Sequence, residues 1–376
     1  MAEGIAYVRE SSEPEDSPPD LYQGAVAWLK TNLFSSMASS LTTLVFVGLM
    51  IWVVPPLVAW ATTNAVWAAP DGEACRQHQD GACWAFIGAK FDYLRFGSYP
   101  SAERWRVNVT EAIGGAVILW LLWPNARRRG IAALLFFFAY PILAFLLLHG
   151  SERLGLPIVD TLLWGGMFVT LLTALVAIVF SLPLGMLLAL GRRSQLPVVR
   201  LAAVIFIEFV RGVPFITVLF MANTMLPLFL PEQWTPDRLL RPLVGIVLFS
   251  AAYMAEEVRG GLQAIRRGQY EGAIALGLHY PLMMALVILP QALAVVLPGI
   301  VNNFVGLFMD TTLVSIVGMT DFLEAMNNAF KDPVWSGPSV TTTGYVFAGI
   351  VYFGFCYSMA RYSAFVERSL AKGRSA

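Results

Sequence analysis

The sequence predicts an all-α fold, a polytopic inner-membrane helical bundle with about eight transmembrane helices. Of its 376 residues, 57% are hydrophobic and 13% are charged, whereas an average soluble domain is roughly 25% charged. The apolar residues lie in blocks long enough to cross a bilayer, and Arg, Gly, Pro or acidic residues bound each block. We therefore expect lipid to be the solvent for most of the chain.

Residues 1–40 are predicted to form a cytoplasmic tail followed by an interfacial elbow helix. The first twenty residues carry acids and prolines in place of the basic start and apolar stretch of a signal peptide. Apolar side chains then recur every four residues, at Leu21, Ala25, Leu29, Leu33 and Met37. This spacing is typical of a helix that lies in the membrane interface.

Residues 41–160 are predicted to form an N-terminal extension with three spans and a long periplasmic loop. The spans are 41–60, 112–123 and 131–148, and the second is the shortest. The loop at 61–110 is too polar to stay in lipid, so it is placed outside.

Residues 161–376 are predicted to hold five spans, at 162–190, 197–230, 243–255, 287–308 and 344–360. The stretch 197–230 is longer than one helix needs and contains Gly212-Val213-Pro214, which interrupts a helix. We therefore expect one discontinuous span there. A polar stretch at 256–280 separates the next two spans.

The placement of basic residues predicts that both termini are cytoplasmic. Lys and Arg accumulate on the cytoplasmic side of membrane proteins. With the amino terminus inside, the segments placed inside hold most of the basic residues, and the short outer loops hold few. The formal net charge is zero, which gives no argument for a nucleic-acid partner.

A spaced motif occupies the polar stretch after residue 255. It reads Glu271-Gly272-Ala273, then Gly277, then Val287-Ile288-Leu289-Pro290. A helix that ends at Gly277 can turn sharply, because Gly accepts a positive φ without a steric penalty. The motif therefore predicts a short helical hairpin that projects into the cytosol and transmits force from a soluble motor. The residues assigned to this coupling role are Arg259, Arg267, Gly268, Glu271, Ala273 and Gly277.

This motif resembles the EAA signature of binding-protein-dependent importer permeases, which reads Glu-Ala-Ala, three residues, Gly, nine residues, Ile-x-Leu-Pro. Gly272 stands where the family usually has Ala, and Val287 stands where it has Ile. The resemblance extends over about 162–368. This part of the sequence is similar in particular to the polar amino-acid branch of these permeases. The stretches that carry it include Leu182-Pro183-Leu184-Gly185, Phe209-Val210-Arg211-Gly212-Val213-Pro214 and Asp310-Thr311-Thr312-Leu313.

The N-terminal extension resembles that of the M-type permease of the general L-amino acid (Aap/Bzt) transporters. The resemblance implies a five-helix importer-permease core at 161–376, a second permease subunit, a periplasmic amino-acid-binding protein and two copies of an ATPase. It also implies an L-amino acid substrate and a heterodimeric pore.

No G-x-x-x-x-G-K-[ST] loop occurs in the sequence, so ATP and Mg are expected on the partner ATPase and no cofactor on this chain. The three His residues are scattered and suggest neither a metal site nor a catalytic site. Two alternatives stay open. The chain could be an ion-coupled secondary transporter, because a broken span with Glu208 and Arg211 suits that class, or a permease for a narrower range of polar amino acids.

Six residues are predicted to line the substrate path: Glu208, Arg211, Asn303, Asp310, Thr311 and Thr312. Asn303 and Asp310 are seven residues apart and share one helix face. The Asp310 carboxylate could pair with a substrate ammonium group, or it could cap a short helix through Val317. Arg211 could pair with Glu208 or act in gating.

Cys75 and Cys83 are predicted to form a disulfide in the outer loop. An oxidising periplasm permits such bonds, and the loop between the two residues is short. Cys356 lies within the last span and is expected to stay reduced.

Overall fold

The computed structural model describes residues 24–123, 126–234 and 236–374. It divides the chain into two compact units, Met1–Ala65 with Asp80–Ala82, and Val66–Gln79 with Cys83–Ala376. The predicted boundary near residue 160 does not coincide with this division. The tail predicted at residues 1–20 lies outside the described residues.

The first unit consists of α1 (Ala25–Leu33) and α2 (Met37–Ala61). Helix α1 lies where the elbow was predicted. Helix α2 begins at a capping box formed by Ser36 and Ser39, and its apolar side chains are not buried in protein. A helix that is apolar all round and has no protein cover is suited to lipid.

Among the described residues, six helices are long and apolar enough to cross a membrane: Met37–Ala61, Ser101–Leu122, Arg129–His149, Met167–Arg192, Tyr280–Val317 and Pro338–Ser369. A seventh candidate is the pair Pro197–Gly212 and Phe215–Phe229, which is bent by 112°. The predicted break at Gly212-Val213-Pro214 is therefore present. The missing N–H of Pro214 and the extended backbone of Val213 account for it.

Three predicted spans are much shorter than the helices observed, and one of them, placed at 344–360, lies within α16 (Pro338–Arg374). The second span was placed at 112–123, but α5 runs over Arg104–Leu122. Polar residues continue this helix because they have partners: the buried Arg106 pairs with Glu103 at 2.7 Å and donates to the Pro157 carbonyl at 2.8 Å. The sixth span was placed at 243–255, but α11 is one helix over Leu240–Ala264 whose last turns carry charges.

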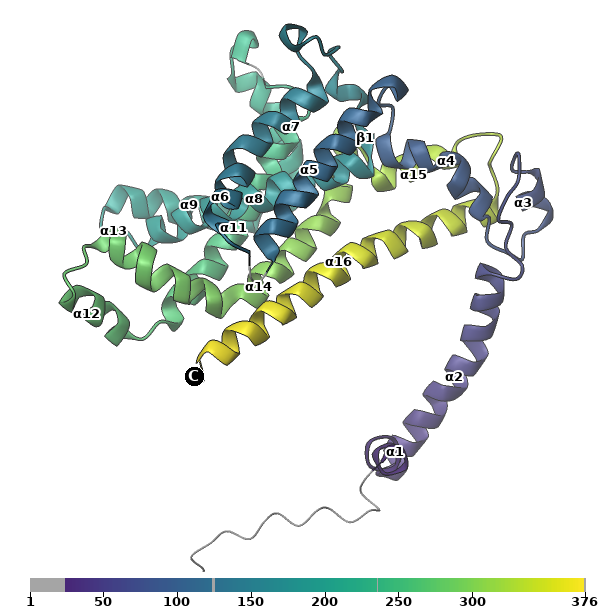
Figure 1. Cartoon of the computed structure of the whole chain (residues 1–376), viewed down its shortest axis with the longest axis horizontal. Coiled ribbons are helices and arrows are strands. Elements are labelled where there is room, and N and C mark those ends of the chain that lie inside the picture. Colours follow the sequence, from purple (N-terminus) through teal and green to yellow (C-terminus); the bar gives the residue numbers. More distant parts are fainter. Residues whose placement is uncertain (1–23, 124–125, 235, 375–376) are drawn as a thin grey trace, which may run out of the picture. The chain divides into compact units, whose positions relative to one another are not determined.

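The second unit is built around α8 (Met167–Arg192), α11 and α14 (Leu289–Asp310). Small residues allow these helices to approach closely. A Cβ at Gly185 would lie 2.4 Å from Met254 Cβ, and a Cβ at Gly261 would lie 2.6 Å from the Ala292 carbonyl oxygen. Helix α16 (Pro338–Arg374) packs against α14 (Figure 1).

The remaining elements connect these helices. They are α3 (Glu73–Gln77), α4 (Trp84–Phe96), α6 (Arg129–Leu134), α7 (Tyr140–His149), α9 (Pro197–Gly212), α10 (Phe215–Phe220), α12 (Arg267–Ala275), α13 (Tyr280–Met283) and α15 (Phe322–Phe330). Strand β1 (Gly165–Gly166) pairs in parallel with β2 (Thr320–Asp321). Short π-helical segments at Leu135–Ala139, Met221–Met225 and Met284–Ile288 lie within the spans. Short 3₁₀ segments occupy Ser101–Glu103, Glu152–Leu154, Thr161–Leu163, Leu226–Phe229, Glu232–Trp234 and Thr311–Val317.

The loop predicted outside the membrane is partly helical in the second unit. Helices α3 and α4 pack against α15 and the start of α16, and Phe86, Phe322, Met326 and Trp335 are buried between them. The sulfur atoms of Cys75 and Cys83 are 1.96 Å apart within this cluster. Backbone groups of both cysteines also bond to α16, because Cys83 N–H donates to Thr343 Oγ1 at 2.8 Å and Ser339 Oγ donates to the Cys75 carbonyl at 3.1 Å.

Candidate functional site

A helical hairpin formed by α12 and α13 joins α11 to α14. Figure 1 shows it projecting at one end of the second unit. Gly277 ends the first arm with a φ of 75°. Gly277 N–H donates to the Ile274 carbonyl at 2.9 Å, and Leu278 N–H donates to the Ala273 carbonyl at 3.1 Å. These two bonds form a Schellman motif, so the sharp turn predicted at Gly277 is present.

The hairpin exposes both charged and apolar side chains. Arg267, Gly268 and Glu271 are exposed, and Ile274 and Leu276 are 63% and 80% exposed. Ala273 is buried in an apolar cluster that also holds Leu262 of α11 and Met284 and Ile288 of the segment before α14. Exposed apolar side chains therefore lie beside charged ones at this end of the unit.

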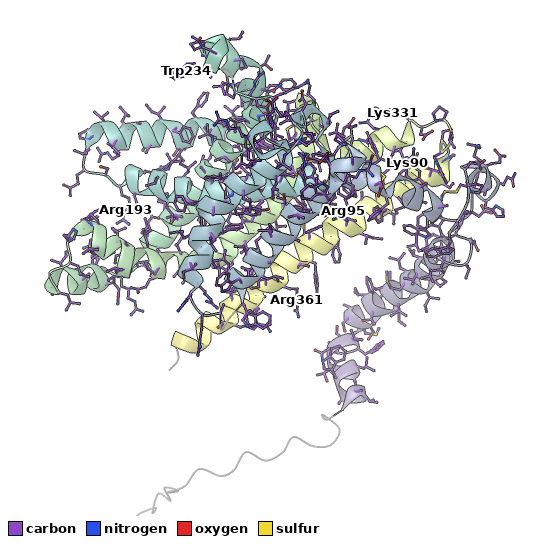
Figure 2. All side chains as sticks on the ribbon, turned by 45° about the horizontal axis from the view of Figure 1, so that its top comes forward. Lys90, Arg95, Arg193, Trp234, Lys331 and Arg361 are labelled. Carbon is purple, nitrogen blue, oxygen red and sulfur yellow. A yellow bond between two sulfur atoms is a disulfide. The ribbon has the colours of Figure 1, made fainter. Side chains whose placement is uncertain are left out.

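Tyr270 does not project from the hairpin. Its ring is partly buried, its hydroxyl donates to the Leu262 carbonyl at 3.4 Å, and Arg193 donates to that hydroxyl at 3.2 Å. Figure 2 shows Arg193 beside the hairpin. A half-buried phenol keeps its hydroxyl bonded, and here these bonds hold α12 to α11 and to the end of α8.

An ion-pair network joins three helices near the hairpin. Arg192 Nη1 lies 2.8 Å from Glu208 Oε1 and 2.9 Å from Glu256 Oε1. The side chain of Glu256 is only 15% exposed, and it also contacts Arg259 at 2.7 Å and Arg211 at 3.7 Å. The suggested pair between Glu208 and Arg211 is therefore not formed. Arg259, predicted on the hairpin surface, instead points to Glu256.

A cavity of about 310 Å³ lies between α10, α11 and α14. Its lining residues are Phe215, Phe249, Ser250, Tyr253, Met254, Asn302, Asn303, Gly306, Leu307 and Asp310. The two predicted residues Asn303 and Asp310 thus line one cavity, as their shared helix face requires. Aromatic rings cover the facing wall, with Phe249 and Tyr253 centroids 4.9 Å apart.

The other predicted path residues lie elsewhere. The buried Thr311 hydroxyl donates to the Phe308 carbonyl at 2.7 Å, and Thr312 donates to the Met309 carbonyl at 3.0 Å. Neither residue lines the cavity. Glu208 also lies in the ion-pair network rather than in the cavity wall. Arg211 lies near the cavity through its contact with Tyr253, whose ring centroid is 5.4 Å from the guanidinium carbon.

The alternative that Asp310 caps a helix is wrong. The 3₁₀ segment Thr311–Val317 follows α14 without a break, and the Asp310 side chain makes no capping bond. Continuous helical backbone leaves no free N–H groups there for a cap to satisfy. The carboxylate therefore remains available on the cavity side.

Sequence reasoning missed the aromatic wall and Glu257. Phe249 and Tyr253 are four residues apart on α11, which is a visible signal for a shared face. Glu257, one turn further, accepts a hydrogen bond from Asn303 Nδ2 at 3.1 Å. This bond joins α11 to α14, and the sequence alone does not show that these two helices pack together.

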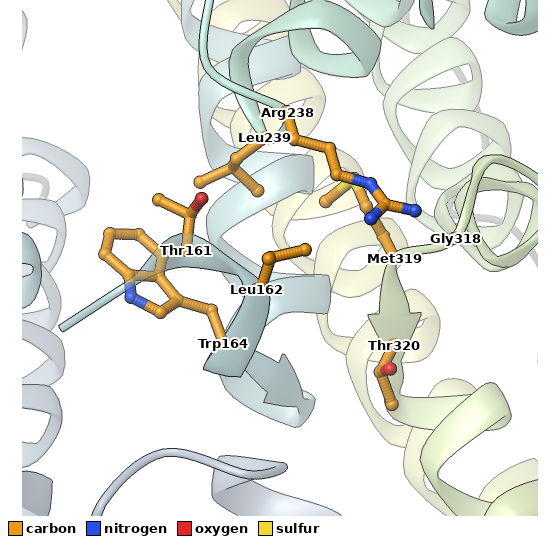
Figure 3. A pocket seen from close by; sticks show the side chains of 8 residues that line it. All are labelled: Thr161, Leu162, Trp164, Arg238, Leu239, Gly318, Met319 and Thr320. Atoms are coloured by element: carbon orange, nitrogen blue, oxygen red, sulfur yellow. The ribbon is translucent and has the colours of Figure 1, made fainter.

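A smaller cavity of about 20 Å³ lies between the segments that lead into β1, α11 and β2 (Figure 3). Thr161, Leu162, Trp164, Arg238, Leu239, Gly318, Met319 and Thr320 line it. A space of that size holds about one water molecule. It is too small for a substrate path.

The bundle, the exposed hairpin and the internal cavity define a membrane transport component. Residues 181–372 match the model of the family described as "Binding-protein-dependent transport system inner membrane component". The chain belongs to this family. Its members are permease subunits of importers in which a separate ATPase hydrolyses ATP, so the chain itself is not an enzyme.

Three relatives illustrate the match. The chain is 46% identical to the inner membrane amino-acid ABC transporter permease protein YhdY of Escherichia coli (strain K12), over 93% of this chain and 94% of that protein. It is 36% identical to the glutamate/glutamine/aspartate/asparagine transport system permease protein BztC of Rhodobacter capsulatus, over 98% of each. The glutamate/aspartate import permease protein GltK of Escherichia coli O6:H1 is 31% identical over 55% of this chain and 92% of its own length.

Proposed function

We propose that the chain is the permease subunit of an ATP-driven importer of L-amino acids in the bacterial inner membrane. One observation carries the proposal: α11 and α14 line the internal cavity, and the same two helices flank the exposed hairpin. A displacement of the hairpin therefore acts directly on the cavity walls. The names of the full-length relatives support amino acids as the transported class.

The hairpin is the contact for the ATPase in this proposal. The exposed Ile274 and Leu276 supply apolar area, and Arg267 and Glu271 supply charges at its rim. Gln291 Nε2 donates to Gln269 Oε1 at 3.0 Å, which links α12 to α14. Force on the hairpin then reaches α14 through this bond and through the buried Ala273. Two ATPase copies bind ATP and Mg, and this chain binds no cofactor.

The hairpin lies in the cytoplasm, and both termini lie on the same side. The excess of basic residues in the segments placed inside supports this orientation. The α4 and α15 layer then faces the periplasm, where a periplasmic amino-acid-binding protein delivers the substrate. A second permease subunit completes a heterodimeric pore, and lipid surrounds both.

Asp310 is the charged group that receives the substrate. A carboxylate within a membrane span is costly unless it is paired, and the ammonium group of an amino acid is a suitable partner. The aromatic wall formed by Phe215, Phe249 and Tyr253 offers apolar area without demanding one side-chain shape. This combination suits a broad range of L-amino acids.

The proposal is tested by reconstituting the chain with its ATPase, second permease and binding protein in vesicles. Uptake of L-amino acids is expected to require ATP and the binding protein, and to persist when a protonophore collapses the proton gradient. Uptake that continues without ATP and stops with the protonophore would instead establish an ion-coupled secondary transporter.

A further inference from the structure

Glu257 and Asn303 connect the cavity to the helix that enters the hairpin. Glu257 lies one turn beyond Tyr253 and Met254, which line the cavity. Asn303 Nδ2 donates to Glu257 Oε1 at 3.1 Å and to the Gly299 carbonyl at 3.1 Å. The amide of Asn303 is therefore held by α11 and by its own helix at once.

The chemistry of these partners fixes the orientation of the Asn303 amide. An ionised carboxylate and a backbone carbonyl can only accept hydrogen bonds. Both flank the same end of the side chain, so the NH₂ group must be at that end, independently of how the amide atoms are assigned. Both N–H donors are then used, and the oxygen Oδ1 is the only polar atom of Asn303 left for a ligand.

We propose that Glu257 is a positioning residue that makes the cavity selective for a cationic donor group. By holding the NH₂ of Asn303, it leaves two acceptors on α14 for the cavity, Asn303 Oδ1 and the Asp310 carboxylate. Within the described part of the chain, no hydrogen bond or ion pair occupies either acceptor. An ammonium group offers three donors and a positive charge to them. This inference rests on the proposed import of amino acids and names the group of the substrate that the cavity recognises.

A substitution at Gly299 is a second way to break the hydrogen bond between Glu257 and Asn303. A Cβ at this position would lie 2.3 Å from Glu257 Oε2. Gly in the interior of a helix is less favourable than Ala. Its presence in α14 is explained by the carboxyl group that lies against it. Gly299→Ala should displace the flexible Glu257 side chain and break its bond to Asn303, while the helix itself is favoured.

The competing interpretation is that Glu257 only links α11 to α14. A structural link would affect every ligand of the cavity equally. A positioning role affects only those ligands that carry the ammonium group. The two are separated by comparing ligands that differ in that group alone.

The experiment measures ligand binding to the assembled importer in nanodiscs, with the binding protein omitted. The probes are L-glutamine and glutaramate, which has hydrogen in place of the ammonium group. The unmodified importer is expected to prefer glutamine. Glu257→Met and Gly299→Ala should each reduce this preference about tenfold, the effect of one charge-assisted hydrogen bond. Gly349→Ala, a helical glycine with open space around it, is the control and should leave the preference unchanged.

Equal losses of affinity for both probes in Glu257→Met and Gly299→Ala would overturn the inference and leave a structural link. A wild-type importer without preference for glutamine would overturn it as well. Neither result bears on ATP-driven import itself, which fails only if ATP-driven uptake with the binding protein is absent. The second result would also remove the ammonium contact proposed for Asp310.

Discussion

Arg192 ties the last turn of α8 to α11, with its Nη1 atom 2.9 Å from Glu256 Oε1. The same guanidinium contacts Glu208 of α9 at 2.8 Å. Glu256 is the centre of this network because three arginines reach it. The network lies where α11 leaves the cavity and approaches the hairpin, so it holds the broken span against the coupling end of the bundle.

Glu256→Ala is expected to lower the free energy of unfolding by about 2 kcal/mol, because it removes charge-assisted bonds and leaves partly buried arginines together. Thermal unfolding of the purified protein in detergent measures the change. Glu271→Ala, which removes an exposed carboxylate, is the matched control and should have little effect on stability. Equal stability of the two variants would contradict the central role of Glu256.

Gly277→Leu is expected to abolish transport while the protein still inserts into the membrane. A Leu side chain is strained at a φ of 75°, so the turn between α12 and α13 changes but the spans do not. ATP hydrolysis should no longer respond to the loaded binding protein. Gly272→Ala is the control, because a Cβ there meets open space within a helix. Normal uptake by Gly277→Leu would remove the hairpin from the coupling path.

Asp310→Asn is expected to reduce transport at least tenfold without loss of stable, assembled protein. The substitution keeps the size of the side chain and removes its negative charge, and no cap is lost because none is formed. Uptake assays and size-exclusion chromatography of the assembled importer test both parts. Wild-type uptake by this variant would exclude a direct contact between Asp310 and the ammonium group.

Cys75 and Cys83 are expected to resist alkylation in the native protein and to react after reduction. Their sulfur atoms are bonded in the structure, whereas Cys356 is a free thiol. Mass spectrometry after labelling with and without prior reduction distinguishes the three residues. Labelling of Cys75 or Cys83 in the unreduced protein would show that the bond is absent in the cell.

Asp321 predicts a pH dependence of stability. Burial raises the pKa of this carboxyl group from 3.8 to about 6, although its backbone bonds at the start of α15 oppose the shift. The folded state therefore holds the proton more tightly than the unfolded state. Stability should fall as pH rises from about 4 to 6, by up to about 3 kcal/mol. Asp321→Asn still caps α15, so it should remove this dependence and raise stability at pH 7.

Asp332→Asn is a control in the same measurement, because the contribution of Asp332 to stability changes with pH in the opposite direction. A hydrogen bond from Lys90 lowers the pKa of Asp332, so its stabilising contribution is lost as pH falls. Figure 2 shows Lys90 near Lys331, the residue before Asp332 in the sequence. If the stability of Asp321→Asn still changes with pH between 4 and 6 as it does in the wild type, the pH dependence does not arise from Asp321.

The sequence was sufficient for features that depend on local periodicity and on turn chemistry. The positive φ at Gly277, the break at Pro214 and the common face of Asn303 and Asp310 each follow from spacing within one segment. Features that depend on pairing between helices were not accessible. The partners of Glu208 and Arg211 lie on other helices, whereas the sequence suggested that these two residues could pair with each other.

The length of α5 shows the same limit in another form. A charge such as Arg106 ends a predicted span when it is read alone, because an unpaired charge is costly in lipid. Its contact with the distant Pro157 carbonyl removes that cost. Helix boundaries near membrane surfaces therefore depend on contacts with distant residues, and a hydropathy profile does not include these contacts.

The contact between α4 and α15 means that the N-terminal extension cannot be removed as an accessory. A chain beginning at residue 161 would lose the side chains that cover Phe322, Met326 and Trp335. It would present this apolar face to water, where it favours aggregation. Any attempt to shorten the protein to the length of the smaller permeases must therefore redesign the surface of α15 as well as cut the chain.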